Sequence, residues 1–98
     1  MAYLWVNLPD VVRDDGSPMP IGELILRWAL GDKRPLGAYH GEEHIDDTYL
    51  VYELDYERAE AVKWFIQRVA RSFGTRIRCR ITVQPPNPAR WKHQPVWR

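Results

Sequence analysis

The chain has 98 residues, enough for one domain with its own core, and 45% of them are hydrophobic, which argues against global disorder. Its single cysteine, Cys79, excludes an internal disulfide and a zinc site built from cysteines. The net charge is only +1, but residues 1–60 hold all 13 acidic residues and sum to −8, whereas residues 61–98 hold nine Lys/Arg and sum to +9. We therefore expect either an anionic partner for the basic part or neutralisation of the two parts within the fold.

The first part of the chain predicts a strand, a helix and a second strand. Residues 2–8 alternate in polarity and are rich in β-forming residues, so they predict a strand that Pro9 ends. After a turn-rich segment, residues 20–30 predict a helix with a proline at its start and Gly31 just past its end. Residues 36–40 predict a short edge strand.

The second part predicts a strand, a helix, a further strand and an arm. Residues 48–54 form the third predicted strand, and Asp55 caps a second helix that runs to about residue 73. Residues 85–88 are too rich in proline to continue a sheet, so we expect a domain over 1–84 and a Pro-rich, aromatic and basic arm over 85–98. The most regular alternation lies before this arm, where Ile77, Cys79, Ile81 and Val83 alternate with Arg76, Arg78, Arg80 and Thr82.

The element order β-α-β-β-α-β predicts an α+β fold, the ferredoxin-like plait. In this fold two helices cover one face of a four-stranded antiparallel sheet and leave the other face open. The first strand lies between the third and the fourth, so side chains from these three strands, among them Trp5, Tyr49 and Arg80, become neighbours on the open face.

The open face predicts a surface for nucleic acid. Arginines two residues apart on a strand are about 6–7 Å apart, and aromatic rings beside them can stack with bases. The arm adds cations interleaved with tryptophans. We therefore expect a non-enzymatic module that binds RNA or single-stranded DNA through Tyr3, Trp5, Arg76, Arg78, Arg80, Arg90, Trp91, Lys92 and Trp97.

This layout resembles the RNA-recognition motif in strand order and in the chemistry of the open face. The segment Leu4-Trp5-Val6-Asn7-Leu8-Pro9 is similar to the short motif of that family but is one residue shorter. The third strand lacks the basic-glycine start and the paired aromatic residues of the family, and Glu53 on this face would repel phosphate. The resemblance therefore extends to the element order and does not indicate membership.

Three alternatives stay open. The open face could be an interface to a protein or to a second copy in a homodimer, with the tail tryptophans docked on it. The chain could be a small metal-independent ribonuclease that uses His93, Lys92 and Arg90. It could also be a protein-binding adaptor or inhibitor, for example of a complex that handles nucleic acid, which presents Glu42, Glu43, Asp46 and Asp47.

The segment His40-Gly41-Glu42-Glu43-His44 matches His-x-x-Glu-His, a pattern of zinc proteases. That chemistry requires a helix, so that both imidazoles lie on one side, and a third ligand. Here a predicted strand precedes the segment and Gly41 lies inside it, so we expect a solvated acidic loop, with neither a metal nor another cofactor. Adventitious or regulatory metal binding through His40, His44, Asp46 and Asp47 is the alternative. The N-terminus lacks signal-peptide features and no segment is long and apolar enough to span a bilayer, so we expect a cytoplasmic protein.

Overall fold

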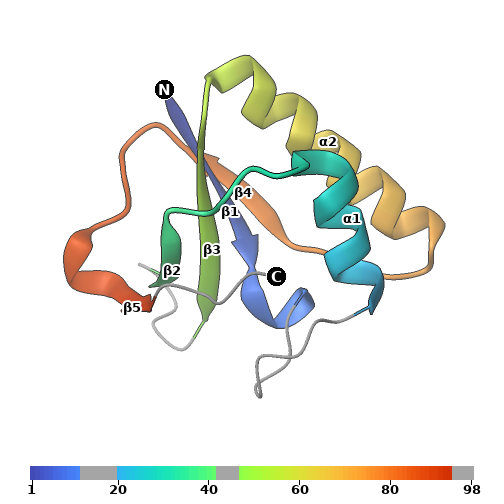
Figure 1. Cartoon of the computed structure of the whole chain (residues 1–98), viewed down its shortest axis with the longest axis horizontal. Coiled ribbons are helices and arrows are strands. Elements are labelled where there is room, and N and C mark those ends of the chain that lie inside the picture. Colours follow the sequence, from blue (N-terminus) through green and yellow to red (C-terminus); the bar gives the residue numbers. More distant parts are fainter. Residues whose placement is uncertain (12–19, 42–46, 94–98) are drawn as a thin grey trace.

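The computed structural model describes residues 1–11, 20–41 and 47–93 (Figure 1). It is an α+β fold with two helices and one antiparallel sheet. The strands are β1 (Ala2–Asn7), β2 (Gly37–His40), β3 (Thr48–Leu54), β4 (Cys79–Thr82) and β5 (Trp91–His93); the helices are α1 (Pro20–Leu30) and α2 (Tyr56–Ser72), with short 3₁₀-helices η1 (Leu8–Asp10) and η2 (Pro88–Arg90).

The sheet has the strand order β4-β1-β3-β2-β5, and every neighbouring pair is antiparallel. The prediction that the first strand lies between the third and the fourth is confirmed. The prediction of four strands is wrong, because part of the Pro-rich arm returns as β5 and pairs with β2. Consequently β2 is an inner strand and not the edge strand that its short sequence predicts.

Local signals set the ends of both helices. The Asp55 carboxylate caps α2 by accepting a hydrogen bond from the backbone N–H of Arg58, at 3.1 Å. Each helix is followed by a glycine with positive φ, Gly31 at 59° and Gly74 at 72°, a conformation that most other residues adopt only with strain. The bounds of α1 agree with the sequence prediction, whereas β4 is shorter than the predicted strand over 76–83.

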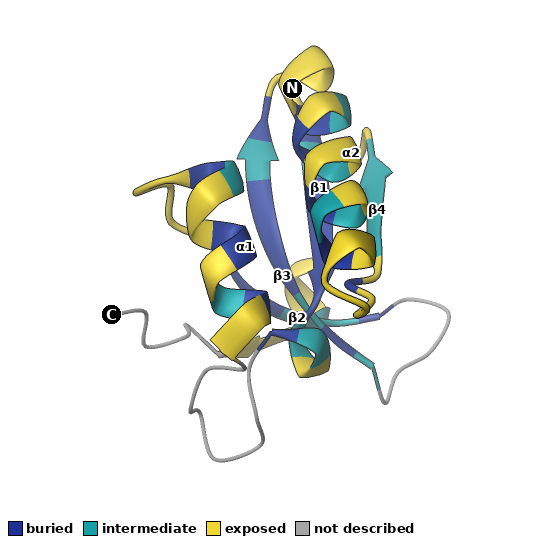
Figure 2. Cartoon of the chain, turned by 90° about the vertical axis from the view of Figure 1, so that its right-hand side faces the viewer, coloured by how far each residue is buried: buried dark blue, intermediate teal, exposed yellow. Residues whose placement is uncertain are grey.

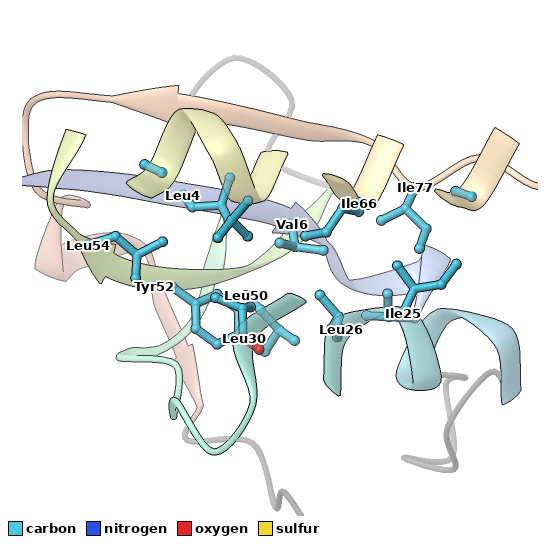
Figure 3. Close-up of a cluster of buried hydrophobic side chains, with 14 of the residues drawn as sticks. Leu4, Val6, Ile25, Leu26, Leu30, Leu50, Tyr52, Leu54, Ile66 and Ile77 are labelled. Atoms are coloured by element: carbon cyan, nitrogen blue, oxygen red, sulfur yellow. The ribbon is translucent and has the colours of Figure 1, made fainter. Parts of the chain in front are cut away.

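Both helices pack on one face of the sheet, where they bury the core (Figures 2 and 3). Alternate residues of β1 and β3 point toward the helices, as the sequence predicts, and meet the buried stripes of α1 and α2. Within the described ranges, neither helix is long and apolar enough to cross a membrane. The larger members of this core are Leu4, Val6, Ile25, Leu26, Leu30, Leu50, Tyr52, Leu54, Ile66 and Ile77.

We call the other side of the sheet the helix-free face. Trp5 and Val51 lie on it, since they alternate with core residues in β1 and β3 and are outside the core cluster. Both are nevertheless buried, at 1% and 0% exposure. The helix-free face therefore has a second, smaller buried layer of its own, which the prediction of an open face did not include.

Candidate nucleic-acid interface

Strand register places side chains of the helix-free face in rows that cross the sheet. One row joins Arg80, Trp5, Val51 and Gly37, from β4 to β2. The next row joins Asn7, Tyr49, Tyr39 and Trp91, from β1 to β5. Directly paired residues in antiparallel strands point to the same face. The first residue of one row is the cation Arg80 and that of the other is the polar Asn7, and most of the remaining residues in the two rows are aromatic.

Arg80 packs against the aromatic part of this face. Its guanidinium carbon is 4.6 Å from the centroid of the Trp5 ring and 5.7 Å from that of Tyr49. Such cation–π contacts are worth about 0.5–2 kcal/mol. Among the described residues no carboxylate forms an ion pair with Arg80, and its Nε is shielded from solvent without a hydrogen-bond partner. The side chain is therefore held in place by rings while its charge is not neutralised by a neighbouring acid.

Trp5 packs against Arg80, and its ring is not exposed to solvent. Its ring packs against Tyr49, at 5.8 Å between centroids and 76° between planes, and against Tyr39 at 6.5 Å. Its indole N–H donates to the Thr82 hydroxyl at 2.9 Å. The sequence prediction that Trp5 stacks directly with bases requires an exposed ring, and that expectation is wrong because only 1% of the residue is accessible.

Arg78 is on the same face, but an acid from the first half of the chain engages it. Its backbone N–H and Nε donate to Asp10 Oδ2 at 2.9 and 3.1 Å, and Nη2 donates to the Asn7 side-chain oxygen at 3.1 Å. These contacts with Asp10 raise the pKa of Arg78 further above its usual range. Among the described residues this is the one ion pair between the acidic and basic halves, so a ligand phosphate would compete with Asp10 for Arg78.

Arg76 does not belong to the predicted row of arginines. Because β4 begins only at Cys79, Arg76 precedes the strand and is exposed on the segment that leads into it. Arg76 is therefore not part of the sheet. Of the three arginines in the predicted row, only Arg78 and Arg80 lie on the helix-free face.

Tyr3 lies at the opposite end of the helix-free face, beside a carboxylate. Its hydroxyl donates to Glu53 Oε2 at 3.2 Å. Partial desolvation, the hydrogen bond and the charge of Glu53 all raise the pKa of Tyr3, so the phenol stays neutral. The ring is half-buried and available at this end, but the neighbouring Glu53 disfavours a phosphate there.

The arm contributes Trp91 to the helix-free face and sends Lys92 to the other side. The Trp91 ring occupies the space beside Gly37, where an added Cβ would lie 2.8 Å from Trp91 Nε1, and the residue remains 49% exposed. Lys92 Nζ donates to the Thr48 hydroxyl at 3.4 Å, on the helix side of the sheet. Arg90 Nη1 donates to the carbonyl of Gly41 at 3.5 Å. Alternation along β5 thus separates Lys92 from the tryptophan that the prediction grouped with it.

Sequence reasoning placed Tyr49 on this face without counting it as a site residue, and it missed Tyr39. Both rings are half-buried and lie beside Trp5. The period-two alternation used for the other strands would have found Tyr39 if it had been applied to residues 37–40. The contribution of Gly37, which leaves room for the Trp91 ring, depends on a strand pairing that the sequence does not reveal.

Several predicted site residues fall outside the described residues. These are Trp97 and the acidic residues Glu42, Glu43 and Asp46, together with His44 of the His-x-x-Glu-His segment. Asp47 is described and half-buried, and its carbonyl accepts a hydrogen bond from the Gly41 N–H at 2.8 Å. In the described part of the chain no three His, Cys, Asp or Glu side chains lie close enough together to hold a metal ion. Nothing is described of the His93 side chain, so the adaptor and ribonuclease interpretations stay predictions.

Burial raises the pKa of the Cys79 thiol to about 12. The thiol is therefore protonated at neutral pH and is a weak nucleophile, in agreement with its place on the core side of β4.

Comparison with protein-family models, with curated proteins and with solved structures found no match to this chain.

Proposed function

We propose that the chain is a non-enzymatic module that binds single-stranded nucleic acid, RNA or DNA, across its helix-free face. The observation that carries this proposal is the placement of Arg80, a cation without an ion-pair partner among the described residues, over Trp5 and next to Tyr49. We also infer that β1–β4 and the two helices form a ferredoxin-like plait to which β5 adds an edge strand.

The parts of the face have different tasks in this proposal. Arg80 binds a backbone phosphate, since its planar guanidinium is already oriented by the Trp5 ring and little side-chain freedom is lost on binding. The accessible rings, Tyr49, Tyr39 and above all Trp91, stack with bases. Neighbouring strands are about 4.8 Å apart, so the four intervals from β4 to β5 span about 19 Å, which accommodates a few nucleotides.

Charge on the face favours a path for the phosphates through its middle. Residues 61–93 contain eight Lys/Arg and no acid, which gives this part of the chain a positive field. The acids on the helix-free side are at its ends: Glu53 is bonded to Tyr3, and Asp10 is paired with Arg78. A nucleic-acid backbone therefore meets the least repulsion beside Arg80.

The test compares two arginines on opposite sides of the molecule. A fluorescently labelled single-stranded 12-mer of uridine or thymidine is titrated with wild type, Arg80→Gln and the matched control Arg71→Gln over a salt series, with anisotropy as the readout. Arg71 is exposed near the end of α2, away from the helix-free face. We expect Arg80→Gln to weaken binding about tenfold or more and to reduce the salt slope by about 0.7 for each phosphate that the protein no longer neutralises.

Arg71→Gln should leave both quantities nearly unchanged. Arg80→Lys keeps the charge but loses the planar stacking geometry, so it should fall between wild type and Arg80→Gln. Far-UV circular dichroism of each variant verifies the fold. Equal affinity and salt slope for wild type and Arg80→Gln, with the fold intact, would show that Arg80 does not contact nucleic acid.

A further inference from the structure

Figure 2 shows exposed residues along both helices, and several of them are large and apolar. On α1, Ile21, Leu24 and Trp28 are 38%, 40% and 53% exposed; Phe65 on α2 is 40% exposed, and Phe73, the C-cap residue of α2, is 51% exposed. The Trp28 and Phe73 rings contact each other across the two helices, with centroids 6.2 Å apart and planes at 37°. We call these five residues the helix-seam patch.

Helical spacing makes the patch continuous along each helix. Ile21, Leu24 and Trp28 follow the spacing i, i+3, i+7, and Phe65 and Phe73 are two turns apart with half-buried Val69 between them. The residues of each helix that face the core form a separate stripe, which on α1 includes Ile25 and Leu26. The patch is therefore a second apolar stripe on each helix, beside the one that the core uses.

The size of the patch exceeds what scattered surface residues produce. If each side chain presents about 150–250 Å², the observed exposures leave roughly 400 Å² of apolar surface open. The largest contiguous apolar patch on a single chain is commonly of this size and is often a functional surface. Protein–protein interfaces commonly have such an apolar centre, to which a polar rim adds the rest of the buried area.

The charges beside the patch indicate which partner fits. On α2, Arg68 lies one turn from Phe65, is exposed and has no ion pair among the described residues, and the helix holds no acid after Glu60. On α1, Arg27 and Glu23 pair with each other at 2.9 Å and nearly cancel. Two copies that met through this surface would bring the arginines of α2 toward one another, which opposes a symmetric dimer, whereas an acidic partner is attracted.

We propose that the helix-seam patch docks an amphipathic helix of another protein whose apolar stripe is flanked by Asp and Glu. A third helix laid across two packed helices buries such stripes by the same side-chain packing that joins α1 to α2. An acidic flank of that helix lies next to Arg68. This surface is on the other side of the sheet from Arg80, so the proposal does not depend on nucleic-acid binding.

The test uses two synthetic helical peptides as probes, with one leucine stripe at i, i+3, i+4 and i+7 flanked by glutamates in one peptide and by lysines in the other. Labelled peptides are titrated with the full chain and followed by fluorescence anisotropy. We expect the glutamate peptide to bind at least tenfold more tightly than the lysine peptide. Trp28→Ala and Phe73→Ala should each weaken this binding about tenfold.

Trp64→Ala is the matched control for Trp28→Ala. Trp64 is 69% exposed but points about 100° away from Phe65 around the axis of α2, so its loss should change the affinity less than twofold. The change Arg68→Glu should remove the preference between the two peptides. All of the substituted positions are exposed, and circular dichroism verifies that each variant is folded.

Three results would overturn the proposal. The first is that neither peptide binds, or that both bind equally well. The second is that Trp64→Ala weakens binding as much as Trp28→Ala, which would show non-specific adhesion. The third is a homodimer in sedimentation equilibrium that Trp28→Ala dissociates, because the occupant would then be a second copy.

Discussion

The contact between Trp91 and Gly37 tests whether β5 belongs to the fold. Gly37 does not have a positive φ, so alanine suits its backbone, but the added Cβ would lie 2.8 Å from Trp91 Nε1 and 3.2 Å from Cδ1. About half of Trp91 is buried, roughly 100 Å² of the 150–250 Å² that an aromatic side chain can bury. At about 25 cal/mol per Å², displacing the ring completely costs at most about 2.5 kcal/mol.

We therefore expect Gly37→Ala to lower the free energy of unfolding by about 1–2 kcal/mol. In a Trp91→Ala background the same change should be neutral or stabilising by about 0.5 kcal/mol, because the next nearest atom, Cε1 of Tyr39, would be at an ordinary 3.5 Å and alanine restricts the unfolded chain. Urea unfolding of the wild type, both single variants and the double variant measures this coupling. An equal cost of Gly37→Ala in both backgrounds would refute the packing of Trp91 on Gly37.

Two further predictions concern β4. Thr82→Val removes the acceptor for the buried Trp5 indole N–H, so we expect a loss of about 1–2 kcal/mol in urea unfolding, whereas Thr82→Ser should keep most of the stability; equal values for both variants would contradict the hydrogen bond. Above pH 9 the Cys79 thiol ionises in the unfolded chain but not in the folded one, where its pKa is raised to about 12, so ionisation favours unfolding. Between pH 9 and 11 the free energy of unfolding of wild type should fall more steeply than that of Cys79→Ala, by up to about 1.4 kcal/mol per pH unit. Parallel pH curves for the two proteins would argue against burial of the thiol.

The sequence was sufficient where the signal is local. The alternation in residues 48–54 predicted β3, and the proline and glycine that flank α1 predicted its ends, because each depends on residues next to one another in the chain. The assignment of side chains to the two sheet faces also followed from alternation. Arg80, Trp5 and Tyr49 were expected on one face, and they lie together there.

What the sequence could not predict depends on contacts between distant segments. The proline-rich composition of the arm argued against a strand, but β5 forms after those prolines and is held by pairing with β2. The burial of Trp5 results from Arg80, Tyr39 and Tyr49, which come from three other strands. The ion pair that engages Arg78 depends on Asp10, 68 positions earlier. Alternation indicates the direction of a side chain but not which neighbours will cover it.

The hydrogen bond from Trp5 to Thr82 joins positions 77 residues apart, and this separation has a consequence for how the chain folds. Strand β1 is made early, yet one of its two sheet partners, β4, is among the last elements of the described chain. Until β4 arrives, β1 has a free edge and Trp5 is uncovered, a combination that favours pairing with other chains. Folding that depends on such distant pairs is slow. A fragment that ends before Cys79 should therefore aggregate, and the helix-free face should form only late in folding.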